Sequence, residues 1–129
     1  MRDAYLTAMV FLGAGFGGAA RHLVNRSVPI SISMHFPLST LIVNVVGSFL
    51  MGLLAGWFAF RGVGMGQTLR LVLTTGVLGG FTTFSAFSLD AALLWQRGAM
   101  GMAAVYVLGT VLASLASVFA GLALVRALA

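Results

Sequence analysis

Residues 69–95 read LRLVLTTGVLGGFTTFSAFSLDAALLW, an apolar window that is interrupted by paired glycines and hydroxyl side chains. About 20 apolar residues let a helix cross the hydrocarbon core of a bilayer, so the window is long enough to span a membrane. Gly79 and Gly80 weaken a helix, and the hydroxyls of Thr82 and Thr83 compete for its backbone hydrogen bonds. The sequence therefore predicts a transmembrane helix that is broken near its centre.

The composition of the whole chain also indicates a membrane protein. Of the 129 residues, 60% are hydrophobic and only 7% are charged, whereas a soluble domain usually carries about 25% charged residues. Three more windows have spanning length: residues 4–24, 38–60 and 99–125. The stretches between the windows are short: residues 25–37, 61–68 and 96–98. We therefore predict an all-α fold class, with one domain over residues 1–129 that consists of four transmembrane helices.

The charged residues are few and mostly positive. Seven Arg against Asp3 and Asp90 give a formal net charge of +5. A basic soluble domain can indicate nucleic-acid binding, but these Arg stand singly at the ends of the apolar windows, as in headgroup anchoring. We therefore expect contact with membrane lipid and no nucleic acid. The chain has no Cys, which excludes a disulfide framework and a thiolate metal site.

The distribution of Arg leaves the membrane orientation open. Four crossings place both chain ends on one side of the membrane. That side would carry four Arg: Arg2, Arg61, Arg70 and Arg126. The other side would carry three: Arg21, Arg26 and Arg97. Orientation follows the Lys/Arg bias between the two sides, and this bias is almost nil. Either the chain sets its orientation weakly by other means, or it inserts both ways and pairs as an antiparallel dimer.

Polar side chains form a stripe on one face of each of two windows. These are Thr40, Asn44 and Ser48 in residues 38–60, and Tyr106, Thr110, Ser114 and Ser117 in residues 99–125. Hydroxyls can bond to their own helix or join neighbouring helices, so packing is one reading of the stripes. The other is a water-filled path, because an amide in mid-membrane needs a partner or water.

The interruption itself allows two further alternatives. A break in a helix frees carbonyl oxygens, which can bind a hard cation such as sodium, as the broken helices of transporters do. Close glycine-mediated packing without an ion is the other reading. Phe84 and Phe87 follow at helical spacing on one face, which is usually a packing pattern. Their ring edges are electropositive, however, and could favour an anion without offering a full charge.

Three motifs together resemble the Fluc (CrcB) family of fluoride channels. They are GGFTTFSAFS at residues 79–88, NVVGSF at residues 44–49 and GFGGAAR at residues 15–21. The resemblance covers nearly the whole chain. It implies a dual-topology homodimer of two antiparallel subunits, with two anion pores at their interface and a central sodium ion. It further implies passive export of fluoride across the cytoplasmic membrane of a microbial cell, a bacterial inner membrane.

The resemblance also implies roles for individual residues. The pore would be lined by seven residues, Asn44, Phe84, Ser85, Phe87, Tyr106, Thr110 and Ser114, with Arg21 near its vestibule. The sodium ion would be held by the backbone carbonyls of Gly79 and Thr82 from both subunits. Many members read TTFSTF where this chain reads TTFSAF, so Ala86 lacks the hydroxyl that they carry.

Other functions fit the sequence less well. A small multidrug exporter also uses four helices, but proton-coupled antiport needs a titratable group within the membrane. Those exporters use a Glu, and this chain offers only Asp90, which we expect to pair with an Arg or to cap a polar vestibule. A passive packing subunit would gain nothing from a broken helix. We expect no enzymatic activity, because the chain has no adjacent acid pair, and His22 and His35 lie near window ends.

Overall fold

The computed structural model describes residues 1–61 and 66–129, and every regular element in those two ranges is a helix. The elements in chain order are α1 (Arg2–Ser27), α2 (Ile30–Ser33), α3 (Leu38–Phe60), α4 (Gln67–Leu71), the π-helical segment η1 (Val72–Leu78), α5 (Gly79–Phe81), α6 (Phe84–Gln96) and α7 (Met100–Leu128). The all-α class predicted from the composition is thus confirmed. The predicted connection at residues 61–68 includes residues 62–65, which lie outside the described part.

Three helical stretches of the described chain are long and apolar enough to cross a membrane: Leu38–Phe60, Gln67–Gln96 and Met100–Leu128. Such lengths match the hydrocarbon thickness of a bilayer, and a helix satisfies its own backbone groups there. The chain is therefore a multi-pass membrane protein. Helix α1 has 26 residues but is less apolar and is not among the three. A fourth crossing by α1 stays a prediction.

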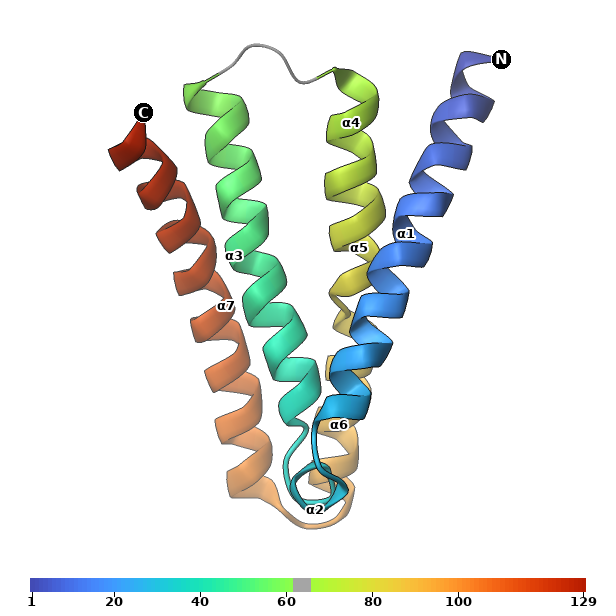
Figure 1. Ribbon diagram of the computed structural model, residues 1–129. Helices are drawn as coiled ribbons and strands as arrows, with labels where there is room; N and C mark the ends of the chain where they lie inside the picture. Colours follow the sequence, from blue (N-terminus) through green and yellow to red (C-terminus); the bar gives the residue numbers. More distant parts are fainter. Residues whose placement is uncertain (62–65) are drawn as a thin grey trace.

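The helices converge toward one end of the molecule (Figure 1). Helices α3 and α7 run side by side, while α1 lies against the stretch from α4 to α5. The two chain ends and the start of α4 lie at the wide end, and α2 lies at the narrow end with the connection from α6 to α7. A cluster of buried side chains occupies the narrow end, where Phe87 and Leu94 of α6 pack against Ala103 and Tyr106 of α7.

Glycines allow the closest helix contacts. A Cβ atom at Gly17 of α1 would collide with the carbonyl of Val77, and one at Gly80 would collide with the carbonyl of Ala14. A Cβ atom at Gly52 of α3 would likewise collide with the backbone of α7. Glycines at four-residue spacing therefore pack helices of the same chain against each other: Gly13 and Gly17 in α1, Gly76 and Gly80 in η1 and α5, and Gly52 and Gly56 in α3.

The helical run from α4 to α6 changes its geometry twice. It is π-helical over Val72–Leu78, and two residues between α5 and α6 are extended. Thr82 has φ −85° and ψ 160°, and Thr83 has φ −154° and ψ 116°. The Thr83 hydroxyl then accepts a hydrogen bond from the Ala86 amide at 3.1 Å, so Thr83 caps the N-terminus of α6. This extended pair places the start of α6 beside α3.

Candidate functional site

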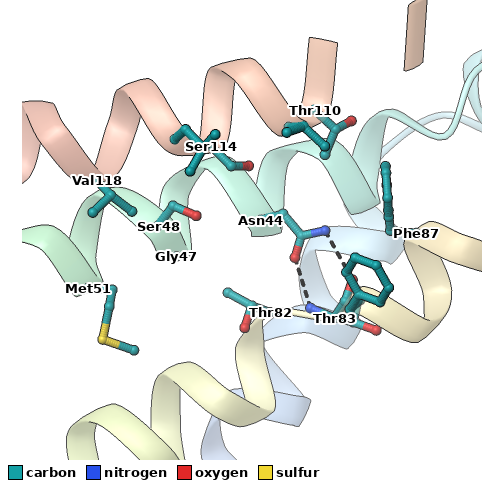
Figure 2. A pocket seen from close by; sticks show the side chains of 13 residues that line it. Asn44, Gly47, Ser48, Met51, Thr82, Thr83, Phe87, Thr110, Ser114 and Val118 are labelled. Atoms are coloured by element: carbon teal, nitrogen blue, oxygen red, sulfur yellow. Dashed lines mark hydrogen bonds between the residues drawn. The ribbon is translucent and has the colours of Figure 1, made fainter. Parts of the chain in front are cut away.

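A cavity of about 390 Å³ lies where α3, α7 and the extended pair meet (Figure 2). Its polar lining comes from three segments: Asn44 and Ser48 of α3, Thr82 and Thr83 of the extended pair, and Thr110 and Ser114 of α7. Its apolar lining includes Phe84 and Phe87 of α6. Five of the residues that the resemblance assigned to the pore therefore surround one cavity: Asn44, Phe84, Phe87, Thr110 and Ser114.

The side chain of Asn44 binds the backbone of the extended pair (Figure 2). Its Nδ2 donates to the Thr83 carbonyl at 3.1 Å, and the Thr83 amide donates to its Oδ1 at 2.8 Å. Asn44 is half-buried and Thr83 is buried. An Asn amide carries two N–H donors, so one N–H of Asn44 remains beyond this pair of bonds. The partner that the sequence required for a mid-membrane amide is thus a stretch of main chain.

These bonds also change which carbonyls of the interruption have donors. In a continuous helix the Thr83 amide would donate to Gly79 and the Ala86 amide to Thr82, each four residues back. Here the Thr83 amide donates to Asn44, and the Ala86 amide donates to the Thr83 hydroxyl. The carbonyls of Gly79 and Thr82 therefore lose their helical donors. Carbonyl oxygens of this kind are suitable ligands for a hard cation.

Two hydroxyls of the lining are buried without a partner in the described part of the chain. They are Thr110 Oγ1 and Ser114 Oγ on α7. Thr110 is only 4% exposed. A buried hydroxyl without a hydrogen bond is costly and calls for an explanation, such as water or an ion that occupies the space beside it. Both hydroxyls belong to residues that line the cavity, although the two oxygen atoms themselves expose almost no surface to it.

The two phenylalanines of the lining differ in their surroundings. Their ring centroids lie 5.5 Å apart, at an interplanar angle of 52°. Phe87 is 8% exposed and packs against Tyr106, whereas Phe84 is 78% exposed. Phe87 is therefore fixed by the core of the narrow end, and Phe84 is covered little by its own chain.

Tyr106, which the resemblance assigned to the pore, is not among the residues that line the cavity. Its side chain is fully buried, with ring centroids 5.5 Å from Phe36 and 5.3 Å from Phe87. Its hydroxyl donates to Asp90 Oδ2 at 3.1 Å. Asp90, which we expected to pair with an Arg or to cap a polar vestibule, accepts this tyrosine hydroxyl and also lines a cavity of about 90 Å³ together with Arg97. In this structure Tyr106 packs against Phe87, which does line the cavity.

The remaining predicted site residues lie apart from the lining. Ser85 is exposed on α6, with its Oγ 3.3 Å from Thr83 Oγ1. Arg21 is half-buried on α1, and Gly79 is exposed in α5. The residues Ala86 and Asp90 contribute no atom to the cavity wall either.

Sequence reasoning missed several residues that shape the cavity. The main chain of Thr83 provides both hydrogen-bond partners of Asn44, and its side chain caps the N-terminus of α6. Thr is a common residue directly before a helix, and this preference could have identified Thr83. Gly47 and Met51 line the cavity from α3. A Cβ atom at Gly47 would collide with Thr82 Cγ2, so this glycine lets the extended pair approach α3. The spacing of Asn44, Gly47, Ser48 and Met51 places all four on one helix face and could have identified them.

Comparisons with known proteins give one consistent family. The family model described as CrcB-like protein, Camphor Resistance (CrcB), matches residues 8–122. A protein of Rhodopseudomonas palustris (strain BisB5) named "Fluoride-specific ion channel FluC" is 57% identical over 120 residues, which cover 93% of this chain and 96% of the relative. Proteins of the same name from Methylobacterium nodulans and Agrobacterium fabrum are 58% identical over 120 residues and 50% identical over 119 residues. These alignments cover 93% and 92% of this chain, and 95% and 94% of the respective relatives.

Proposed function

This chain belongs to the CrcB-like protein family, and we propose that it is a fluoride-selective channel through which the ion passes down its gradient. The relatives named above carry that activity in their names. The observation in the structure that carries the proposal is one uncharged cavity lined by Asn44, by Thr110 and Ser114, and by the rings of Phe84 and Phe87.

The cavity lining suits a small anion that must lose its water. Fluoride is compact and strongly hydrated, so a pore has to replace its hydration shell with other donors. The hydroxyls of Thr110 and Ser114 and the remaining N–H of Asn44 can donate, and the ring edges are electropositive. No charged side chain belongs to this lining. Neutral donors let the ion leave again, whereas a lining Arg would hold it.

We extend the proposal to a sodium ion held by the backbone carbonyls of Gly79 and Thr82. The support is that both carbonyls have lost their helical donors to Asn44 and Thr83. A single chain offers few such oxygens, so ligands from a second copy would complete the set. When bound, the ion would supply a positive charge near the centre of the membrane. Atomic absorption on protein dialysed into potassium buffer tests this, and protein without retained sodium would argue against it.

The second copy is part of the same proposal, as an antiparallel homodimer. Phe84 lines the cavity yet is 78% exposed, so a partner would be needed to close the path around it. The nearly balanced Arg distribution suits a chain that inserts in both directions. In a bacterial inner membrane, such a channel would let fluoride leave the cell whenever the internal concentration is higher.

The proton-coupled exporter is not favoured. It would need a titratable group in contact with the transported cation. Asp90 is the acid available within the spans, and it accepts the Tyr106 hydroxyl outside the cavity lining.

The hydroxyls provide the direct test of the proposed path. We expect the double variant Thr110→Val, Ser114→Ala, reconstituted in liposomes, to release fluoride at least tenfold more slowly, because the dehydrated ion loses two donors. Ser117→Ala is the matched control, since Ser117 lies on the same helix but outside the cavity lining. A double variant that releases fluoride as fast as the control would contradict the proposal.

A further inference from the structure

A second cavity lies between α3 and the run formed by α4 and η1. It has a volume of about 400 Å³ and is lined by Met51, Ala55, Phe58, Ala59, Arg70 and Thr74. Met51 lines both this cavity and the one beside Asn44. Figure 2 shows Met51 on α3, beyond Gly47 and Ser48 as seen from Asn44. The two cavities are therefore neighbours along α3.

The α3 residues that line the two cavities form one continuous stripe. They follow at intervals of three or four residues from Asn44 through Ser48, Met51 and Ala55 to Phe58. Such intervals keep side chains on one face of a helix. The fourteen steps from Asn44 to Phe58 span about 21 Å at 1.5 Å per residue. The two cavities thus follow one face of α3, from near the wide end of the molecule to Asn44, and we call this face with its two cavities the groove.

Arg70 supplies the charge of the second cavity. Its guanidinium lies 4.8 Å from the ring centroid of Phe58, a cation–π contact that holds it against the α3 wall. The Thr74 hydroxyl donates to the Arg70 carbonyl at 2.8 Å, so its proton is already engaged. The acids of the chain are Asp3 and Asp90, and neither forms an ion pair with Arg70 in the described ranges. The charge of Arg70 is therefore available to an anion in the groove.

Arg61, which lies at the same end of the molecule, has a different setting. Arg61 stacks over Trp57 at 5.3 Å and donates from Nη2 to the Leu128 carbonyl at 2.8 Å. That bond joins it to the C-terminal end of α7, and it lines neither of the two cavities. Arg61 therefore serves as a natural comparison: a cation at the same end, stacked on an aromatic ring, but outside the groove.

We propose that Arg70 forms an anion-collecting vestibule, which draws small monovalent anions into the groove that leads along α3 to the Asn44 cavity. The inference rests on the proposed channel function and assigns the entry step of the same path. A charge at the mouth of a low-dielectric groove raises the local concentration of counter-ions. Arg70 is exposed, so water weakens its hold on any one ion and lets the ion move on.

The test compares initial fluoride efflux from liposomes at low and high ionic strength. The Debye length is about 30 Å at 0.01 M salt and about 3 Å at 1 M. We expect Arg70→Gln to lower efflux about threefold to tenfold at low salt and less than about twofold at high salt, because screening removes the effect. Arg70→Lys keeps the charge and should retain most of the rate. Arg61→Gln, the matched control, should stay within about twofold of the parent chain at both salt concentrations.

Several results would overturn the inference. An Arg70→Gln rate equal to that of the parent chain at low salt would do so, as would equal losses at both salt concentrations, which indicate a structural defect or lipid anchoring. An equal loss in Arg61→Gln would show a general surface-charge effect. If Arg70→Gln does not fold, the salt dependence of the parent chain provides the test. The vestibule requires that fluoride efflux through the parent chain falls severalfold as the salt concentration rises, and an efflux independent of salt would contradict it. A parent chain without fluoride efflux overturns the proposed function itself, whereas an active parent with an unaffected Arg70→Gln overturns only the vestibule.

Discussion

Asn44 and Thr83 are 39 positions apart in the chain and are joined by two hydrogen bonds between a side-chain amide and a main-chain peptide. The Asn44 side chain binds both the N–H and the carbonyl of Thr83, which a continuous helix would use for its own hydrogen bonds. The extended conformation of Thr82 and Thr83 is thereby tied to α3. Because α6 begins directly afterwards at Phe84, the same two bonds set where Phe84 and Phe87 stand relative to the cavity.

The first prediction concerns this pair. Asn44→Ala leaves the amide and the carbonyl of Thr83 without partners, at a cost of about 1–3 kcal/mol for each buried group. We expect a lower midpoint of thermal unfolding in detergent and a fluoride efflux reduced at least tenfold, because α6 loses its position. Circular dichroism and liposome efflux measure the two effects. Ser117→Ala controls for the loss of a polar side chain within a span, and an Asn44→Ala chain as stable and as active as that control would contradict the role.

The second prediction separates the two phenylalanines. Phe87→Ile removes a ring that packs against Tyr106 in the core, so we expect a loss of about 1–3 kcal/mol in stability as well as slower efflux. Phe84 is largely exposed within the chain. Phe84→Ile should therefore slow efflux with little change in the unfolding midpoint and with the proposed dimer still assembled. Unchanged efflux in both variants would remove the proposed role of the ring edges.

The third prediction uses two adjacent glycines of α1. A Cβ atom at Gly17 would collide with the Val77 carbonyl, whereas a Cβ atom at Gly18 would meet open space. We expect Gly17→Ala to destabilise the chain by at least about 1–3 kcal/mol, since the backbones of α1 and η1 must separate. Gly18→Ala should be neutral or slightly stabilising, because Ala favours a helix over Gly. Thermal unfolding in detergent compares the two, and equal midpoints would contradict the packing of α1 against η1.

The fourth prediction addresses the membrane orientation. Additional Lys residues next to Arg61 should bias insertion toward one direction, because Lys and Arg favour the cytoplasmic side. If the channel needs two inverted copies, the biased chain should lose most of its efflux and regain it with a copy biased in the opposite direction. Labelling of a cysteine introduced at one chain end, with reagents added from either side of the membrane, measures the orientation. Full efflux from a uniformly oriented population would reject the antiparallel dimer.

Hydropathy predicted the long helices closely. The window at residues 38–60 coincides with α3, and the window at residues 99–125 lies within about three residues of α7. Backbone groups in lipid must be satisfied within a helix, so a long apolar window leaves few alternatives. The π-helical segment Val72–Leu78 was not predicted, because hydropathy carries no signal for a shift from i+4 to i+5 bonding.

The candidate site was predictable in its composition and less so in its contacts. Two residues of each polar stripe line one cavity: Asn44 and Ser48 of α3, and Thr110 and Ser114 of α7. The stripe placed Tyr106 on the same face as Thr110, but its long side chain reaches Asp90 of α6 instead. Asn44 was expected to need a partner, and the sequence could not indicate which one. That partner is a main-chain peptide in another helical run, and main-chain groups have no residue-specific signal.

The measurement that tests the central claim most directly is ion efflux from liposomes that contain the purified chain and a mixture of potassium fluoride and potassium chloride. With valinomycin present to carry the counter-charge, we expect rapid fluoride release and chloride release close to that of protein-free vesicles, without any energy source. Fluoride release no faster than from protein-free vesicles, or equal release of both halides, would contradict the account.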